Sequence, residues 1–534
     1  MITFLTLTEK IMFSLAVFYN VIKEIKRKKF LTNYINVILH YLFFELILLL
    51  GAFCYYLFFA NRGIELFDEG YFVHAAERIF QGEQPYRDFA FQYTPAYFYL
   101  LAFLYKIFGP SVLAGRFLSL SICMLIICFN FLILNKLKLT SYKIIFLSFL
   151  GIVSFGYPLI NIPTPVWPIV LISLALILAN IYWLKLNSSK HYFYLVIIGL
   201  LLGLSLSLRQ NLGLAFILLW NFLIFFEKSK PLLQRIKNLL VINTTWFVFT
   251  FFWVYYFFSG DNIVSLIEFI NFSKKFSTQF AFTYPPISFI LKPLGIFKLL
   301  PYYLPLIFLL FVVRYLFGKN KNWNIISFSL VSLTGFIMYV YPNSELLHVY
   351  PFLGPILASA IIFFLANEVK LIDRGKLIIT FIIVLMIGIG FYLTLFREYY
   401  RYNPPYRLQN TSLNIPRARG IMVEKTMANN LTSLSKFMNQ RTLKNNYIFS
   451  YPYYPMIYFI LNRRNPSKDL IYALRLWHQY DDKIILDEIK NKKVKYIVTS
   501  FGYVFDSDIS RFIAKQKEIF KNSYFKIFEI VNSK

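Results

Sequence analysis

Charged residues, cysteine and histidine are all scarce in this chain. Of its 534 residues only 15% are charged, three are cysteine and five are histidine, whereas 58% are hydrophobic and 20% are aromatic. The cysteines Cys54, Cys123 and Cys128 all lie within apolar runs, so neither a disulfide framework nor a cysteine-based metal site is predicted. Soluble globular proteins carry more charge than this. The composition therefore excludes an ordinary soluble enzyme and indicates a protein whose surface faces lipid.

Long apolar stretches account for much of the hydrophobic content. Residues 41–60, 112–134 and 377–396 each reach or approach the roughly 20 apolar residues that cross the hydrocarbon layer. Lipid offers the backbone no hydrogen-bond partners, so these stretches are predicted to be helices. Together the runs predict about eleven spans, rising to about twelve or thirteen if residues 94–108 also cross. We expect this last segment to lie on the membrane or dip into it.

The net charge of +29 is distributed in a way that indicates membrane topology. Lysines and arginines form short clusters in every second loop, for example at residues 23–29, 136–143, 228–237 and 370–376. They do not form the continuous basic face that binds nucleic acid, so no nucleic-acid partner is predicted. Basic loops stay in the cytoplasm. The alternation predicts a multi-pass protein of the cell membrane with a cytoplasmic N-terminus and an extracytoplasmic C-terminus.

The chain divides into three predicted parts. These are a cytoplasmic or interfacial segment at residues 1–34, an all-α polytopic membrane domain at 35–396 with its first external loop at 61–93, and a small extracytoplasmic α/β domain at 397–534. In the last part we expect helices within 417–440, at 484–489 and at 509–519, and strands at 447–451, 494–500 and 524–530. No glycine-rich phosphate loop follows these strands, so nucleotide binding has no support.

The first external loop carries two adjacent carboxylates, Asp68 and Glu69. The residues that follow place Phe72, Val73 and Ile79 on one face, which predicts a helix lying on the membrane surface. A carboxylate at the start of that helix is suited to act as a general base for a hydroxyl acceptor, with its neighbour as a hydrogen-bonding partner. Asp68 equally fits a simple helix cap, and the sequence leaves both interpretations open.

The same loop continues with Arg87, Asp88 and Tyr93. The arginine and the second acid are candidates for substrate contact, and pairing with each other explains them equally well. Tyr93 is one of several loop tyrosines able to stack on a sugar, although tyrosine is enriched wherever a protein meets the membrane interface. All three are candidate substrate-binding residues, each with a structural alternative.

Another candidate site is the sequence Arg209-Gln210-Asn211 at a predicted membrane boundary. A guanidinium there is able to grip a phosphate through two N–H groups. A side chain that snorkels to the interface is the competing interpretation. We expect these three residues to bind the substrate.

Four further candidates lie in later external loops. Lys274 and Lys275 offer point charges to a phosphate or form a solvated pair, and Glu345 and His348 place an acid and a histidine together, either for substrate binding or for a structural hydrogen bond. No carboxylate cluster with metal-ligand spacing accompanies them. No metal or other cofactor is therefore predicted, while a weakly bound divalent cation stays open.

The order of these motifs resembles the GT-C superfamily of membrane glycosyltransferases. Within it, the chain is similar to the branch that contains the protein O-mannosyltransferases and the lipid A aminoarabinose transferases. The resemblance rests on the acidic pair after the first span and on Gly82-Glu83-Gln84-Pro85-Tyr86-Arg87-Asp88, Phe108-Gly109-Pro110-Ser111, Ala114-Gly115-Arg116, Arg209-Gln210-Asn211-Leu212-Gly213, residues 345–348, residues 447–464 and Lys495-Tyr496-Ile497-Val498. It covers nearly the whole chain, and the first loop is its most distinctive part. The extra sugar-binding insertion of the protein mannosyltransferases is missing, so the acceptor stays open.

The resemblance implies transfer of a sugar from a polyprenyl-phosphate donor to a hydroxyl group of a lipid, glycan or protein of the cell envelope. It assigns Asp68 as the base or acceptor-binding group, with Glu69 in support, and implies no nucleotide cofactor. A single displacement would invert the anomeric carbon.

Other classes of protein stay compatible with the sequence. A transporter or flippase of lipid-linked saccharides shares the membrane body, although the chain has no internal repeat and little charge at mid-membrane. A noncatalytic scaffold is the second alternative. Polymerases and ligases that use diphosphate-linked glycans also share the membrane body, but they place their large external loop later in the chain.

Overall fold

The computed structural model describes residues 32–137, 141–154, 159–185, 190–227, 230–258, 295–318, 322–340, 351–361, 404–472, 481–500 and 506–531, with a few short pieces between 267 and 396. Backbone contacts divide the chain into two units, Met1–Ala52 and Phe53–Lys534. The described part of the first unit is the beginning of helix α2 (Thr32–Ala60). All other elements belong to the second unit.

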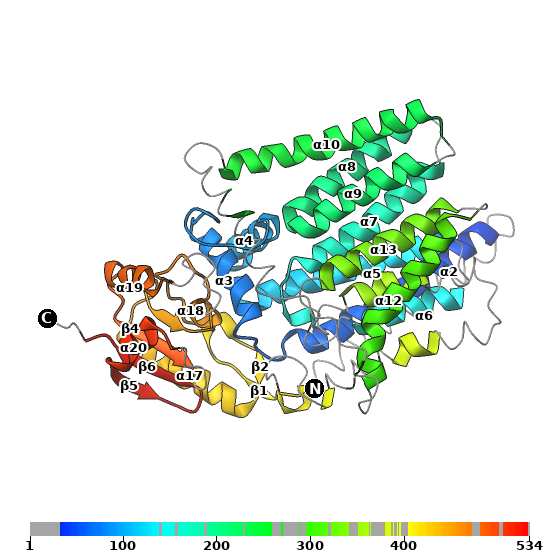
Figure 1. Ribbon diagram of the computed structural model, residues 1–534. Helices are drawn as coiled ribbons and strands as arrows, with labels where there is room; N and C mark the ends of the chain where they lie inside the picture. Colours follow the sequence, from blue (N-terminus) through cyan, green and yellow to red (C-terminus); the bar gives the residue numbers. More distant parts are fainter. Residues whose placement is uncertain are drawn as a thin grey trace. The chain divides into compact units, whose positions relative to one another are not determined.

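Apolar helices make up the larger part of the second unit (Figure 1). They are α5 (Val112–Lys136), α6 (Ser141–Ser154), α7 (Val166–Lys185), α8 (Lys190–Leu208), α9 (Gln210–Phe226), α10 (Leu232–Phe258), α12 (Gly295–Leu316) and α13 (Trp323–Val340), with a 3-10 turn at Leu159–Asn161 and a π-helical turn at Leu353–Leu357. Within the described residues, five helices are long and apolar enough to cross a membrane: α5, α7, α8, α10 and α13. The total of about eleven spans stays a prediction, because several predicted spans lie partly outside the described residues.

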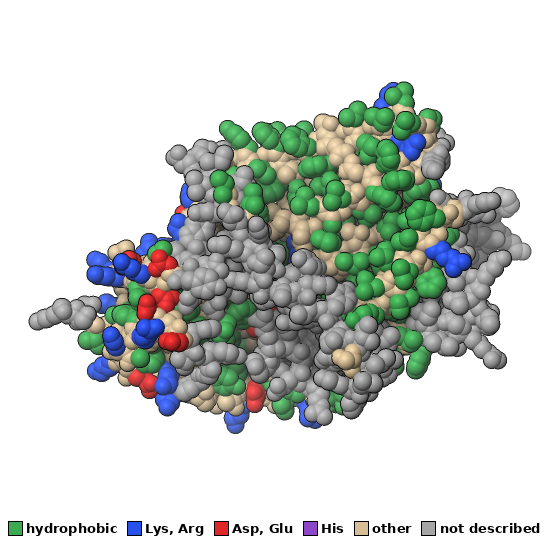
Figure 2. Space-filling view, viewed as in Figure 1, with side chains coloured by type: hydrophobic (Ala, Val, Ile, Leu, Met, Phe, Trp, Pro, Cys, Tyr) green, Lys and Arg blue, Asp and Glu red, His purple; other side chains and the backbone are tan. Residues whose placement is uncertain are grey.

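Large apolar side chains cover the outer face of these helices. On α10, Phe247, Phe251, Phe252 and Tyr256 are each more than half exposed. Figure 2 shows hydrophobic side chains across the helical surface, whereas charged side chains gather over the C-terminal strands and helices. An exposed aromatic surface of this kind is expected to face lipid.

Two short helices occupy the region between α2 and α5. Helix α4 (Ala96–Phe108) has 13 residues and is therefore about 20 Å long, less than the roughly 30 Å hydrocarbon core. Its length agrees with the expectation that residues 94–108 do not cross. Helix α3 (Asp68–Phe80) packs against α4 and against α18 (Met456–Leu461).

The prediction that α3 lies on the membrane surface is wrong. Every residue from Glu69 to Arg78 is buried within the protein. The apolar face of α3 is compatible with contact to lipid, but a helix that packs between two other helices has the same apolar face. Its polar side is also covered, as described below.

The C-terminal region is a small α/β layer. Its helices are α17 (Lys425–Arg441), α18, α19 (Asp482–Asn491) and α20 (Asp508–Ala514), its strands are β1 (Thr411–Ser412), β2 (Met422–Val423), β3 (Phe449–Tyr451), β4 (Tyr496–Ser500), β5 (Lys517–Lys521) and β6 (Phe525–Glu529), and 3-10 turns stand at Tyr406–Leu408 and Pro416–Ala418. The main sheet has the order β3-β4-β6-β5, with β3 parallel to β4 and the other pairs antiparallel. Apolar residues of β3, β4, α19 and α20 form its core.

Most of the predicted elements of this region are present, with one clear error. The helix predicted at residues 509–519 ends at Ala514, and the chain turns into strand β5 at Lys517. Ile509, Ile513 and Phe520 fit a helical spacing, but Phe520 is paired with Ile527 of β6. Periodicity alone does not distinguish these alternatives over so short a stretch.

The C-terminal region joins the chain that follows α2. Met422 of β2 accepts a hydrogen bond from the Gly63 amide and donates one to the Asn61 carbonyl, with N–O distances of 2.8 and 2.7 Å. The predicted domain boundaries at 34 and 396 stay predictions. Backbone contacts group residues 53–534 in one unit and do not divide the chain at either position.

Candidate active site

The first turn of α3 is capped by Glu65. Its carboxylate accepts hydrogen bonds from the amides of Phe67, Asp68 and Glu69, with an N–O distance of 3.1 Å to Phe67 and of 3.0 Å to Glu69. These amides have no partner within the helix, so a carboxylate beside them stabilises its start. Asp68 itself is the first helical residue and is partly exposed. Glu65 thus performs the capping that the sequence also allowed for Asp68.

Glu69 forms a fully buried ion pair with Arg116 of α5. The Nε and Nη2 atoms of Arg116 lie 2.6 and 2.8 Å from the two carboxylate oxygens, and both side chains are at most 1% exposed. Arg116 also donates to the carbonyls of Ala60, Arg62 and Gly63. A buried charge is tolerated when it is paired and its remaining N–H groups are bonded. The pair therefore fixes the end of α2, the start of α3 and the start of α5 relative to one another.

Arg209, Gln210 and Asn211 lie where α8 ends and α9 begins. The Gln210 side-chain amide forms two hydrogen bonds with the backbone of the first loop. It donates to the Gln92 carbonyl at 2.7 Å and accepts from the Thr94 amide at 3.3 Å. Asn211 donates to the Met338 carbonyl of α13 at 3.0 Å. Two of the three candidates thus join other parts of the chain to this junction.

The third candidate, Arg209, lies between two aromatic rings. Its guanidinium carbon is 5.5 Å from the centroid of Tyr93 and 4.7 Å from that of Tyr339, and its Nε donates to Asn211 at 3.3 Å. Tyr339 is also within electrostatic range of Asp68. Aromatic rings beside a guanidinium stabilise its positive charge, and a guanidinium is able to bind a phosphate through its N–H groups.

The structure thus brings together candidates that are far apart in sequence. Arg209 contacts the rings of Tyr93 and Tyr339 at the end of α13, and Asp68 at the start of α3 is close enough to Tyr339 to interact with it electrostatically. A carboxylate, a guanidinium and aromatic rings at one place are able to accept a proton, bind an anion and stack on a sugar.

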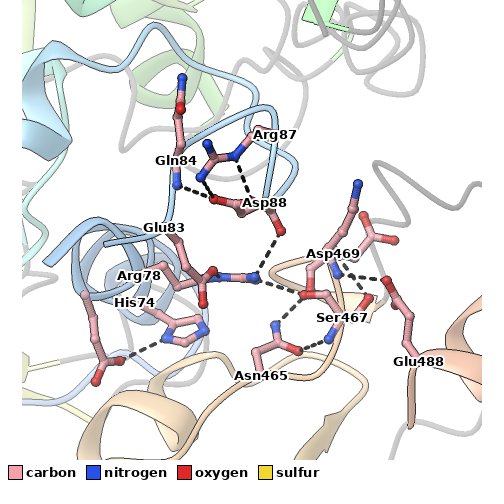
Figure 3. Close-up of polar contacts among 12 residues, drawn as sticks. His74, Arg78, Glu83, Gln84, Arg87, Asp88, Asn465, Ser467, Asp469 and Glu488 are labelled. Atoms are coloured by element: carbon pink, nitrogen blue, oxygen red, sulfur yellow. Dashed lines mark hydrogen bonds and ion pairs between the residues drawn. The ribbon is translucent and has the colours of Figure 1, made fainter. Parts of the chain in front are cut away.

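Arg87 and Asp88 form the ion pair that the sequence left open. The Nε and Nη2 atoms of Arg87 lie 3.0 and 2.7 Å from the Asp88 oxygens, and the Gln84 amide donates to the same carboxylate at 2.7 Å (Figure 3). Partial burial alone would raise the pKa of Asp88, but the hydrogen bonds from Arg87 and Gln84 hold it below its ordinary value. The pair shapes this loop, and its contact with a substrate stays a prediction.

Four candidates lie outside the described residues: Lys274, Lys275, Glu345 and His348. Among the residues that the structure does describe, no three His, Cys, Asp or Glu side chains are grouped so that they could hold a metal ion.

Sequence reasoning missed the charged residues that α3 buries. His74 and Glu77 are at most 2% exposed and Arg78 is 6% exposed, and Glu77 pairs with the distant Arg417. A signal was present, because three further ionisable residues follow Asp68 and Glu69 in a short helix whose other residues are mostly apolar. Their partner from the C-terminal region was not visible in the sequence.

Comparisons with solved structures bear on the fold of the chain. No family model and no curated protein matches the chain in sequence. Among solved structures, it is similar to ArnT from Cupriavidus metallidurans bound to undecaprenyl phosphate, with a TM-score of 0.55 and 13% identity over 93% of this chain and 98% of that chain. ArnT in the apo state gives a TM-score of 0.50 and 12% identity over 94% of this chain and 99% of that chain.

The chain has the GT-C fold. The predicted fold class, a helical multi-pass membrane body with a small C-terminal α/β region, is therefore confirmed. Because sequence identity to these GT-C structures is 12–13%, the likeness establishes the fold, and the chemistry has to be argued from the residues of this chain.

Proposed function

We propose that this protein is a glycosyltransferase that passes a sugar from a polyprenyl-phosphate donor to a hydroxyl group of a cell-envelope lipid, glycan or protein. The observation that carries the proposal is the contact of Arg209 with Tyr93 and Tyr339, with the carboxylate of Asp68 within electrostatic range of Tyr339. The GT-C fold supports it, since the similar ArnT structure contains undecaprenyl phosphate. A lipid-linked donor also explains why the site is built among apolar helices.

Arg209 is the proposed partner of the donor phosphate. Its guanidinium contacts the rings of Tyr93 and Tyr339, and its Nε donates to Asn211. A fixed guanidinium binds a phosphate oxygen pair with two parallel N–H groups and stabilises the charge that the departing phosphate gains. Lys274, Lys275 and His348 are proposed as further phosphate contacts, and Arg87, Asp88, Gln210 and Glu345 stay predicted substrate-binding residues.

Asp68 is the proposed base. It takes the proton of the acceptor hydroxyl while that oxygen forms a bond to the anomeric carbon of the sugar. The bond from this carbon to the phosphate oxygen breaks, and its electron pair leaves with the lipid phosphate towards Arg209. Attack from the opposite side inverts the anomeric carbon. No metal or other cofactor is part of this step.

The side of the membrane follows from charge. Basic clusters in every second loop favour a cytoplasmic N-terminus and put the loop with Asp68 and the C-terminal region outside the cell. The reaction would therefore take place at the outer face of the cell membrane.

The test is turnover of purified protein with a panel of radiolabelled polyprenyl-phosphate sugars, measured as release of polyprenyl phosphate. Wild type should turn over at least one donor, Asp68→Asn should lose turnover by about 100-fold or more, and Asp506→Asn should match wild type. Asp506 is a suitable control because its side chain is 94% exposed. Arg209→Gln should raise the donor KM and lower kcat, because Arg209 is proposed both to bind the phosphate and to stabilise its charge as it leaves.

Absence of turnover with every donor would contradict the proposal. Tight binding of a lipid-linked glycan by both wild type and Asp68→Asn, without turnover, would favour the transporter or the scaffold instead.

A further inference from the structure

Helix α3, which begins with the proposed base, buries three ionisable side chains besides Glu69. His74, Glu77 and Arg78 occupy successive turns of a helix only 13 residues long, and none is more than 6% exposed. Buried ionisable groups are costly unless paired, and both Glu77 and Arg78 have partners in the C-terminal region. The role of these buried charges therefore depends on which parts of the C-terminal region they contact.

Arg417 joins α3 to the C-terminal end of α18. It forms an ion pair with the fully buried Glu77, donates to the Phe459 carbonyl at 2.9 Å and donates to the Asn462 side chain at 2.5 Å. The other oxygen of Glu77 lies 3.0 Å from Nδ1 of His74. Glu77 is therefore bonded on both sides, and α3 has no freedom to rotate without breaking the pair.

Arg78 joins the C-terminal region to the first loop (Figure 3). Its guanidinium donates to the Ser467 carbonyl at 2.8 Å, to the Asp88 carbonyl at 3.2 Å and to the Glu83 carboxylate at 2.5 Å. One side chain thus fixes the segment around residue 467 to the loop that leads to Tyr93.

Backbone contacts flank Asp68 itself. The Met456 amide donates to the Leu66 carbonyl at 3.2 Å. A Cβ added to Gly70 would lie 2.4 Å from the Met456 nitrogen, so the backbones of α3 and α18 meet where only glycine fits. Residues two positions before and two positions after Asp68 are therefore in contact with the same residue of the C-terminal region.

We propose that residues 404–472 are a positioning element for the reaction and that Arg417, acting through Glu77, is a positioning residue that aims Asp68 at the site beside Arg209. The inference rests on the proposed function. Arg417 touches no reacting atom; its ion pair sets the rotation and axial position of α3. The buried Glu77–Arg417 ion pair ends on the same helix that carries the proposed base, which favours a role in placing that base over a role in stability alone.

The two roles differ in their kinetics. A misplaced base slows the chemical step, and a displacement of about 1 Å costs about 100-fold in rate. The phosphate contacts lie on other elements, so donor binding should be preserved. Arg417→Met should therefore lower kcat by about 10- to 100-fold and leave the donor KM within about twofold of wild type.

The experiment compares wild type, Arg417→Met, Arg417→Lys, Glu77→Gln and the exposed neighbour Arg419→Met in detergent. Steady-state kinetics are measured with the lipid-linked donor, and hydrogen exchange is followed at the α3 amides. We expect Arg417→Met and Glu77→Gln to lose kcat and to exchange faster in α3, Arg417→Lys to recover part of kcat, and Arg419→Met to match wild type in both. If Arg417→Met does not fold, Glu77→Gln and Arg417→Lys make the same test.

An unchanged kcat in Arg417→Met and Glu77→Gln, beside an active wild type, would overturn the inference. Exchange in α3 equal to that of Arg419→Met would overturn it as well, whether or not the protein is active. If wild type releases no polyprenyl phosphate from any donor, the proposed function fails, and hydrogen exchange still decides whether Arg417 holds α3.

Discussion

Replacing Arg116 by methionine should reveal how strongly the fold depends on its buried ion pair. Methionine keeps the length of the stem and removes the guanidinium that donates to Glu69 and to three backbone carbonyls. The Glu69 carboxylate is then left fully buried without a counter-charge. Removing one partner of such a pair costs about 3–5 kcal/mol.

Two further variants separate the charge from the hydrogen bonds. Glu69→Gln leaves the buried Arg116 guanidinium without a counter-charge and puts an NH2 group where one carboxylate oxygen accepted, so we expect a similar loss of about 3–5 kcal/mol. The double variant Glu69→Gln, Arg116→Met leaves no charge buried, and it should be more stable than the sum of the single losses by about 1–3 kcal/mol. Arg87→Met is the matched control, because the Arg87 side chain of its ion pair is 51% exposed and such pairs contribute about 0–1 kcal/mol.

The assay is equilibrium unfolding in mixed micelles with increasing denaturing detergent, followed by the fluorescence of the seven tryptophans. Equal stability of Arg116→Met and Arg87→Met would refute the reasoning, since it would mean that Glu69 is not a buried charge in the folded protein. A double variant less stable than the two losses added together would refute the assigned pairing.

Three further perturbations test other parts of the structure. Gly213→Ala places a methyl group 2.3 Å from a backbone atom of α8, so it should displace Arg209 and raise the donor KM by about tenfold or more, measured by steady-state kinetics. Burial lowers the pKa of His74 below its usual 6.5. Below pH 6.5 the unfolded chain therefore binds a proton that the folded protein does not, and the stability of the fold should decrease. His74→Asn should reduce this decrease, measured as melting temperature between pH 6.5 and 5. Gln210→Glu loses the N–H that holds the turn carrying Tyr93, and should cost about 1–3 kcal/mol in detergent unfolding, whereas an unchanged midpoint would contradict the contact.

Regular patterns made much of the fold predictable. The apolar runs predicted the long helices, a short apolar run predicted the buried strand β4, and alternation predicted the strand β6. Short elements were less accessible: α18 has six residues, and its sequence has no cap or period that distinguishes it from a loop. The surface position predicted for α3 failed because an apolar face packs equally well on lipid or on protein.

The site was predictable only in part for a different reason. Asp68, Arg209 and Gln210 fall in recognisable motifs, but their supporting partners come from distant parts of the chain. Arg116 is 47 residues from Glu69, and Arg417 is 340 residues from Glu77. Such pairs are set by tertiary packing, which local patterns in one sequence do not encode.

Gly70 and Met456, which are in contact in the folded protein, are synthesised far apart in time during translation. The ribosome delivers the loop with Asp68 early and the residues that complete its setting near the end. During most of translation and membrane insertion, the loop with Asp68 therefore lacks its contacts with the C-terminal region. Under the proposed function, we therefore expect incomplete copies to leave the lipid-linked donor unused, and proteolytic removal of residues 404–472 to abolish turnover while the membrane helices stay intact.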